Sequence, residues 1–194
     1  MFFDPVDFLA RDPAAARDPV EAGRLWREAM QRARLCEAMA RAADAKGYGG
    51  CAVADVIELA GLSRATFYKH YRNKEECFLA TFEAAVETML AVVEEALAGE
   101  AAATRRGEAA IEAMLDLLAD EPAVARLVTI EARAAGERGQ KRYEAALERF
   151  VALAAGVERP AGRDTMSRLI AGAAVDALVR ELTARRSGQA GLGS

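Results

Sequence analysis

A repeating apolar pattern, broken by a glycine, marks the middle of the chain. Apolar residues recur at helical spacing across residues 53–60, and Gly61 follows at once. A glycine directly after an apolar stripe is typical of the end of a helix, because it adopts the left-handed conformation without strain. Ser63 then offers a hydroxyl that accepts an amide hydrogen bond from the next turn. The pattern therefore predicts a helix, a tight turn and a short second helix that begins near Arg64.

The second helix has two distinct faces. If Phe67 points into the core, a rotation of about 100° per residue places Tyr71 beside it and directs Ala65 and Lys69 outward. Thr66 and Tyr68 then lie on the two shoulders of the outward face. This face is small, polar and basic.

A third helix is expected directly after the second. Asn73 supplies its cap, Glu76 stands in the reciprocal capping position, and apolar residues then continue at helical spacing to about Ala98. A short helix presented by two others is the helix-turn-helix, whose second helix enters the DNA major groove. We therefore expect this region to bind double-stranded DNA.

The local charge agrees with DNA binding, although the chain carries a net charge of −4. Residues 62–74 contain no acid and four cations, Arg64, Lys69, Arg72 and Lys74. A solvated surface helix is the alternative, but it requires neither the interleaved aromatics nor the close helix breaks. The candidate DNA contacts are Ser63, Arg64, Ala65, Thr66, Tyr68, Lys69, His70 and Lys74. Among them, Lys74 is expected to contact phosphate.

The run GLSRATFYKHYRNKEECF, preceded by ARAADAKGYGGCAVADVIELA, resembles the DNA-binding domain of the TetR/AcrR family of transcriptional regulators. The resemblance covers residues 34–84 and adds a helix before the pair. It implies a homodimeric repressor that binds a palindromic operator and is released by a small-molecule effector bound to a C-terminal helical domain. One departure is that Cys51 and Ala52 stand where the family has a threonine hydroxyl that caps the helix and reaches a phosphate.

The rest of the chain also reads as helical, so the expected fold is all-α with a three-helix N-terminal domain and a C-terminal regulatory and dimerisation domain. The expected helices span residues 25–46, closed by Gly47, and residues 74–98, 108–119, 123–135, 138–155 and 163–186. The expected divisions are a flexible arm over 1–24, a DNA-binding domain over 25–78, a regulatory domain over 79–186 and a flexible tail over 187–194. Phe2, Phe3, Phe8 and Leu9 offer the arm an alternative, which is to dock on the protein.

The last expected helix is apolar over more than one stripe and rich in small residues. Such a helix buries two sides, and a symmetry-related copy is an economical partner for the second side. The predicted dimer contacts are Ile170, Ala173, Ala174, Ala177 and Leu178. Either residues 138–155 complete the interface together with 163–186, or the interface is smaller than is usual in the family.

An acid on an apolar stripe marks a candidate effector site. Glu131 follows Val124 and Leu127 at helical spacing, and a buried acid needs a partner. It pairs with an arginine of a neighbouring helix, tilts to solvent, or orients a ligand. For the ligand alternative, the expected lining also contains Phe82, Met89, Met114, Leu118, Tyr143 and Phe150.

Composition removes several other classes of function. The three cysteines, Cys36, Cys51 and Cys77, are far apart and the chain has one histidine, so neither a metal site nor a cofactor is expected. We expect a reducing, cytoplasmic location and no membrane contact, since the sequence lacks an apolar run of spanning length. No catalytic constellation stands out, so we expect no enzyme. The alternative function is a helical adaptor whose helix-turn-helix contacts protein instead of DNA.

Overall fold

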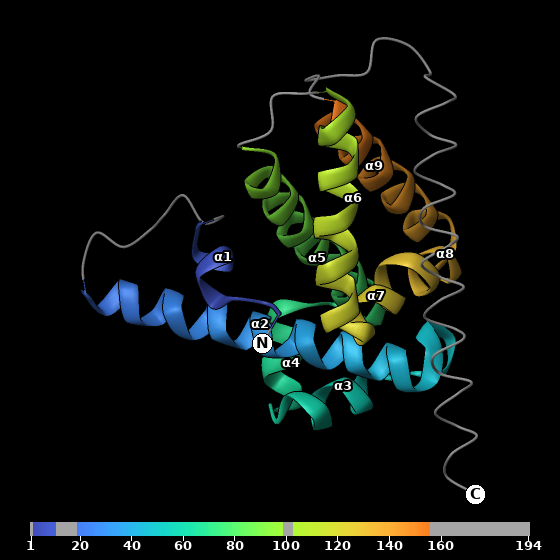
Figure 1. Cartoon of the computed structure of the whole chain (residues 1–194). Helices are drawn as coiled ribbons and strands as arrows, with labels where there is room; N and C mark the ends of the chain where they lie inside the picture. The colour runs from blue at the N-terminus through green and yellow to red at the C-terminus, as the bar shows by residue number, and fades with distance from the viewer. Residues whose placement is uncertain (1, 11–18, 99–102, 156–194) are drawn as a thin grey trace, which may run out of the picture. The chain divides into compact units, whose positions relative to one another are not determined.

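The computed structural model describes residues 2–10, 19–98 and 103–155 (Figure 1). Every regular element within these residues is a helix, which confirms the all-α fold. The chain divides into two compact units between Ala85 and Val86, whereas the sequence placed the division after residue 78.

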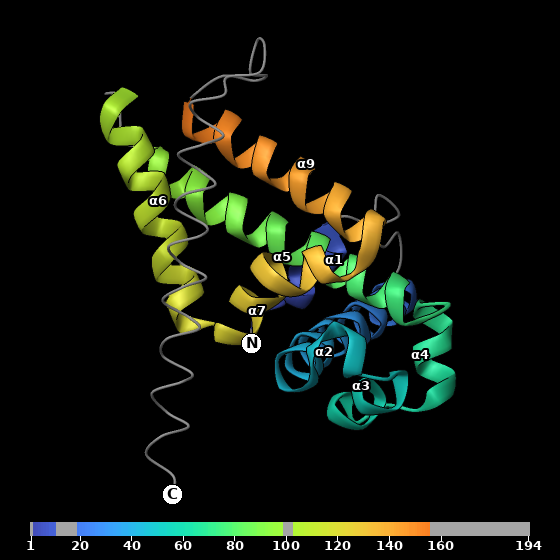
Figure 2. The same cartoon turned by 90° about the vertical axis from the view of Figure 1, so that its right-hand side faces the viewer.

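The N-terminal unit is built around one long helix. Its elements are α1 (Pro5–Ala10), α2 (Pro19–Gly50), α3 (Val53–Ala60), α4 (Arg64–His70) and the first part of α5 (Lys74–Leu97). Both α3 and α4 lie against α2 (Figure 2). Gly47 interrupts α2 with φ 71° and ψ 157°, at the residue where the sequence predicted the helix to end. At its other end α2 begins at Pro19, which is earlier than expected.

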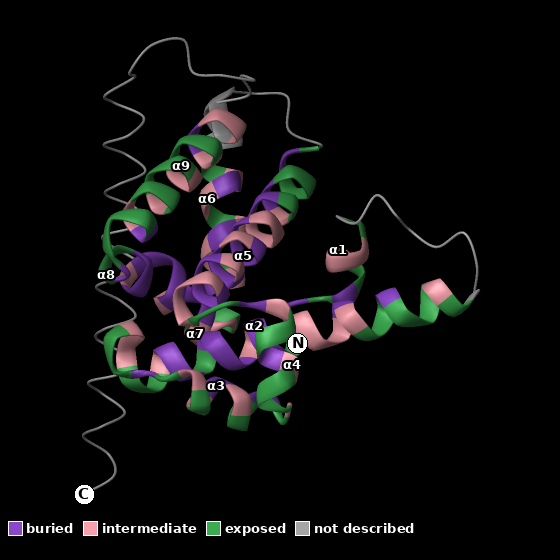
Figure 3. Ribbon diagram, turned by 180° about the vertical axis from the view of Figure 1, so that it is seen from behind, coloured by how far each residue is buried: buried purple, intermediate pink, exposed green. Residues whose placement is uncertain are grey.

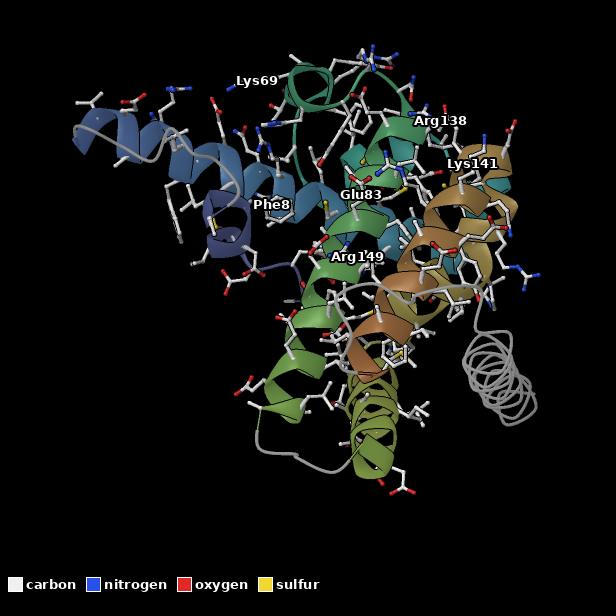
Figure 4. The ribbon with its side chains drawn as sticks, turned by 90° about the horizontal axis from the view of Figure 1, so that it is seen from above. Phe8, Lys69, Glu83, Arg138, Lys141 and Arg149 are labelled. Atoms are coloured by element: carbon white, nitrogen blue, oxygen red, sulfur yellow. The ribbon has the colours of Figure 1, made fainter. Side chains whose placement is uncertain are left out.

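Residues 2–10 pack against the N-terminal unit and do not form the free arm that was expected. Phe2 and Phe3 are buried, and their rings meet edge to face with centroids 5.1 Å apart. The short helix α1 packs against α2, and Phe8 projects from α1 on the side of α2 (Figure 4). Residues 2–10 therefore dock on the protein, which was the alternative to a flexible arm. The free energy gained by burying the two phenylalanines outweighs the conformational entropy lost when the segment is ordered. Residues 11–18 lie outside the described part of the chain.

The turn between α3 and α4 forms as the sequence predicted. Gly61 ends α3 in the left-handed conformation with φ 59°. The Oγ of Ser63 accepts a hydrogen bond from the Thr66 amide at 3.0 Å, and α4 begins at Arg64. These two local signals fix the length of the turn and thereby the direction in which α4 leaves it.

The start of α5 is also capped, with one difference in detail. Asn73 Oδ1 accepts a hydrogen bond from the Glu76 amide at 2.8 Å, as expected. The Glu76 carboxylate reaches back to the amide of Arg72 at 2.7 Å, one residue before the expected partner. The helix break between α4 and α5 is therefore held from both sides.

The C-terminal unit contains the remainder of α5 and five further elements. These are α6 (Ala103–Asp120), α7 (Pro122–Arg126), the π-helical turn η1 (Leu127–Glu131), α8 (Ala132–Ala134) and α9 (Gly136–Ala155). The single helix expected over residues 123–135 is thus divided by a π-helical turn, in which the Ala132 amide bonds to the carbonyl of Leu127. Pro122 begins α7 and Gly136 has φ 83°, so the predicted start and end of this stretch are confirmed.

Helix α9 buries little of its surface. Most of its residues are exposed or half-buried, including the apolar residues expected to face inward (Figure 3). Tyr143, Leu147, Phe150 and Leu153 are all half-buried. The expected helix over 163–186, the tail over 187–194 and the predicted dimer contacts Ile170, Ala173, Ala174, Ala177 and Leu178 lie outside the described residues.

Candidate nucleic-acid interface

Helix α4 is anchored to the N-terminal unit by two aromatic side chains. Phe67 is fully buried, Tyr71 is nearly so, and their ring centroids lie 6.0 Å apart. The Tyr71 hydroxyl lies 3.7 Å from the Sγ of Cys36 on α2. Burial raises the pKa of the Tyr71 hydroxyl, so it stays neutral in this site. These anchors determine which face of α4 is turned outward.

The outward face of α4 combines cations with an aromatic ring. Arg64, Ala65, Tyr68 and Lys69 are exposed. Tyr68 is 45% exposed, which is unusual for a large aromatic side chain, and the guanidinium of Arg64 lies 5.4 Å from its ring centroid. Guanidinium, ammonium and phenol groups together donate hydrogen bonds to base edges and phosphates, while Ala65 leaves room for a close approach.

Two of the candidate residues shape the start of α4. The Oγ of Ser63 caps the helix and lies 2.9 Å from the Oγ1 of Thr66. The two hydroxyls therefore bond to each other. Any contact they make with DNA must share these oxygen atoms with the cap.

The end of α4 is tied to α2 by two side-chain contacts. Lys69 Nζ donates to Oε1 of Glu28 at 2.9 Å. His70 Nε2 lies 2.9 Å from Oε1 of Gln31, and its imidazole is about half-buried. Burial, followed by the positive charges of Arg32 and Lys69, lowers the pKa of His70. The neutral imidazole thus donates to Gln31, so His70 helps to position α4 in addition to its predicted role.

Lys74 connects the start of α5 to the turn between α2 and α3. Its Nζ donates to the carbonyl of Tyr48 at 2.7 Å and to that of Cys51 at 2.9 Å. The same ammonium lies 4.4 Å from the centroid of the Tyr48 ring. A lysine that the sequence assigns to phosphate therefore also holds together three segments of its own domain.

Three positioning residues were not singled out from the sequence. Glu28 and Gln31 lie on one face of α2 because they are three residues apart, and this spacing was the available signal. Arg34 Nη2 donates to the carbonyls of Ala60 and Gly61 at 2.6 and 3.3 Å, where α3 ends. These partners come from more than twenty residues away, and only the tertiary fold brings them to the helix pair.

The start of α3 replaces the missing threonine hydroxyl with a carboxylate. Asp55 accepts a hydrogen bond from the amide of Ala52 at 2.8 Å and pairs with Lys46 Nζ at 2.7 Å. The pKa of Asp55 is lowered, first by the bond from Lys46 and then by the bond from Ala52. An anionic cap at this point stabilises the helix but supplies no hydroxyl donor for a phosphate.

The candidate effector residues divide between the two units. Phe82 belongs to the N-terminal unit and the other six belong to the C-terminal unit. Met114, Leu118 and Glu131 are buried there, while Met89, Tyr143 and Phe150 are half-buried.

Glu131 has an arginine partner, although not one from a neighbouring helix. It is 4% exposed, and its Oε1 accepts a hydrogen bond from Nη2 of Arg126 at 2.9 Å. The π-helical turn explains this pairing of residues five apart, because each turn there contains more residues than an α-helical turn. An arginine partner therefore accounts for the burial of the acid, but this partner is Arg126 of the same stretch of chain and not an arginine of a neighbouring helix.

Comparison with known proteins identifies the helix-turn-helix. Residues 35–81 match the family model described as "Bacterial regulatory proteins, tetR family". The match includes the C-terminal half of α2, all of α3 and α4, and the start of α5. Residues 35–81 form a TetR-family DNA-binding domain. Helix α4 is the second helix of the helix-turn-helix in this matched region.

A curated helix-turn-helix regulator is similar to part of this chain. The HTH-type transcriptional activator FasR of Mycolicibacterium smegmatis is 28% identical over 83 residues. This alignment covers 43% of this chain and 38% of the relative, so the chain matches well under half of the length of FasR.

Two solved structures of regulators share the fold. The fatty acid degradation regulator FadR of Bacillus halodurans has a TM-score of 0.69 and 13% identity, covering 78% of this chain and 87% of that chain. FadR of Bacillus subtilis, solved in complex with stearoyl-CoA, has a TM-score of 0.69 and 16% identity, covering 79% and 88% of the two chains. At these identities the likeness concerns the fold.

No group of three or more histidine, cysteine, aspartate or glutamate side chains in the described part could hold a metal ion. Among the helices of that part, none is both long and apolar enough to cross a membrane.

Proposed function

We propose that this chain is a transcriptional repressor that binds a palindromic operator as a homodimer and leaves it when a small molecule binds the C-terminal unit. The single observation that carries the proposal is the orientation of α4. Its aromatic anchors Phe67 and Tyr71 are buried, while Arg64, Tyr68 and Lys69 are exposed together. A solvated surface helix also buries apolar residues and exposes charged ones, but it has no use for a large aromatic ring such as Tyr68 exposed among the cations.

The operator contacts follow from the geometry of α4. Tyr68 and Lys69 reach base edges, Arg64 reaches the phosphate or a guanine, and Ala65 permits close approach. Ser63, Thr66, His70 and Lys74 act at the border of this surface, where each also bonds to its own domain. In a dimer, the two copies of α4 must lie about 34–36 Å apart to enter successive major grooves.

Dimerisation is proposed to use the small and apolar residues of the segment 163–186. Isologous contacts through Ile170, Ala173, Ala174, Ala177 and Leu178 bring the same surface of two copies together. The largely unburied surface of α9 supports its use as the second helix of such an interface.

Effector binding reaches the DNA-binding unit through α5. This helix begins at Lys74 in the N-terminal unit and runs to Leu97 in the C-terminal unit. A tilt of α5 changes the position of α4 and so the separation of the two recognition helices. A ligand shifts this equilibrium only by its difference in affinity between the two states, so ligand and operator oppose each other by the same factor.

One observation bears on the chemical class of the effector. A protein with this fold was solved in complex with stearoyl-CoA, and an acyl chain suits a lining of methionine and aromatic side chains such as Met114 and Phe150. Long-chain acyl-CoA is therefore the first class of compound to test.

The test is the salt dependence of DNA binding. The full-length chain is titrated into a random-sequence duplex and into a duplex enriched from a random pool, at a series of salt concentrations. We expect the affinity to fall steeply with salt, because each neutralised phosphate contributes a slope of about −0.9 to the logarithmic plot. A protein adaptor would enrich no duplex from the pool and would bind the random-sequence duplex only weakly, which would refute the proposal.

A further inference from the structure

One exposed cation of α4 is held by a carboxylate of α2. The Nζ of Lys69 donates to Oε1 of Glu28 at 2.9 Å. The lysine side chain is 56% exposed, whereas the glutamate side chain is 18% exposed. In Figure 4, Lys69 projects from α4 on the side of α2. The carboxylate is therefore sheltered by its own domain, while the ammonium stands at the surface that faces DNA.

Glu28 binds a second cation at the same time. Its Oε1 also accepts a hydrogen bond from Nη1 of Arg24 at 3.2 Å. The bond from Lys69 is the main cause of the lowered pKa of Glu28, and the charges of Lys69 and Arg24 add to the effect. The carboxylate consequently remains ionised throughout the neutral pH range. Glu28 precedes residues 35–81, so it lies outside the part of the chain that matches the family model.

We propose that Glu28 is a positioning residue for DNA recognition, because it tethers Lys69 so that the ammonium is offered to base edges and withheld from phosphates of arbitrary sequence. This inference rests on the proposed DNA-binding function. It assigns a specificity role to an acid that does not itself contact DNA.

The physical reason lies in the competition between two anions for one ammonium. A phosphate that approaches Lys69 also meets the negative charge of the Glu28 carboxylate, which repels it, whereas a neutral base acceptor is not repelled. Phosphate contacts carry no sequence information, so this competition lowers the affinity for every sequence alike. An ammonium has three N–H donors, however, and a tethered Lys69 still donates to a base acceptor that lies within its reach. The tether thus weakens random binding and preserves binding to the cognate duplex.

The test compares the full-length chain with its Glu28→Gln variant. The amide removes the negative charge but keeps an oxygen of the same size. Dissociation constants are measured by fluorescence anisotropy on a random-sequence duplex and on a duplex enriched by the wild type, at a series of salt concentrations. We expect random-sequence affinity to rise about two- to fivefold, in line with the small energies of exposed ion pairs. The salt slope should steepen by about one unit per bound protomer, while affinity for the enriched duplex does not rise.

Two further variants separate the tether from general charge repulsion. Glu21→Gln removes an acid of the same helix that pairs with Arg24 at 3.7 Å, and it should leave the salt slope as in the wild type. In a Lys69→Ala background, Glu28→Gln should no longer change the ratio of the two dissociation constants. Equal thermal unfolding midpoints of wild type and Glu28→Gln establish that the variant is folded.

Each outcome decides the inference. The inference is overturned if Glu28→Gln leaves both the ratio of the two dissociation constants and the salt slope at their wild-type values. It is also overturned if Glu28→Gln changes that ratio as much in the Lys69→Ala background as it does in the wild type. In both cases the wild type still binds DNA, and the proposed function stands. A wild type that shows no salt-dependent DNA binding instead removes the proposed function, and this inference with it.

Discussion

Replacing Lys74 by methionine should destabilise the DNA-binding unit, even in the absence of DNA. The lysine ammonium donates to the carbonyls of Tyr48 and Cys51 at 2.7 and 2.9 Å and lies 4.4 Å from the Tyr48 ring centroid. Methionine keeps the aliphatic part of the side chain but leaves both carbonyls without this donor. The turn between α2 and α3 then loses its connection to α5.

The magnitude follows from these contacts. Each hydrogen bond to a charged group contributes about 1.5–3 kcal/mol, and a cation over an aromatic ring adds about 0.5–1 kcal/mol. Lys74 is half-buried, so water replaces part of the lost bonding, and we expect a net loss of about 2–4 kcal/mol. For a chain of this length, a loss of 2 kcal/mol lowers the unfolding midpoint by about 4–8 °C.

The assay is thermal and urea-induced unfolding followed by circular dichroism, with Lys46→Met as the matched control. Lys46 is also a lysine of this region, but it is exposed and pairs only with the surface carboxylate of Asp55. Its replacement should shift the midpoint far less. Equal midpoints for Lys74→Met and the wild type would refute the structural role and would leave phosphate binding as the sole task of this lysine.

Three further predictions concern other parts of the chain. Gly139→Ala should destabilise the C-terminal unit by about 1–3 kcal/mol, because the added Cβ would overlap the carbonyl oxygen of Ala132, whereas Gly23→Ala, with no atom within 4 Å, should not destabilise the chain in urea unfolding. The lowered pKa of His70 means that the unfolded state binds the proton first, so the free energy of unfolding should fall as the pH drops below about 6.5. This fall should be smaller in His70→Gln, and an identical pH profile for the two proteins would contradict the reasoning. If the chain forms the proposed dimer, Ala174→Arg should convert it to a monomer in sedimentation velocity, because an isologous interface meets the charge twice; a stable dimer of this variant would place the interface elsewhere.

Local signals in the sequence were sufficient to predict the helix-turn-helix. Gly61, Ser63 and Asn73 each act within a few residues of their own position, and the structure has all three at helix ends with the expected roles. The buried anchor Phe67 followed from helical periodicity alone. Short-range capping and periodicity depend little on the rest of the fold, which is why these predictions held.

Features that depend on distant partners escaped prediction. The bonds from Lys69 to Glu28 and from Lys74 to Tyr48 link residues more than twenty positions apart. A lysine in a basic run gives no local sign that an acid of another helix neutralises it. Likewise, the burial of Phe3 and the packing of α1 against α2 depend on tertiary contacts that the sequence does not display.

The π-helical turn was missed for a different reason. Residues 127–131 carry the same apolar periodicity as an ordinary helix, and a single inserted residue changes the register without changing the composition. The consequence for the site is specific. The turn places Arg126 beside Glu131 within one stretch of chain, whereas helical spacing suggested a partner from a neighbouring helix.

The central claim is that the outward face of α4 reads DNA sequence. The most direct test measures how well a double variant of that face distinguishes the enriched duplex from the random duplex. Affinities of the wild type, Tyr68→Ala/Lys69→Ala and the control Lys141→Ala are measured on the enriched and random duplexes at one salt concentration. Lys141 is an exposed lysine of α9 that pairs with Glu137 at 2.6 Å (Figure 4). We predict that the α4 variant loses about 1–3 kcal/mol of discrimination per lost base contact while the control keeps the wild-type ratio. A Tyr68→Ala/Lys69→Ala variant that discriminates as well as the wild type would contradict the assignment of α4 as the reading helix.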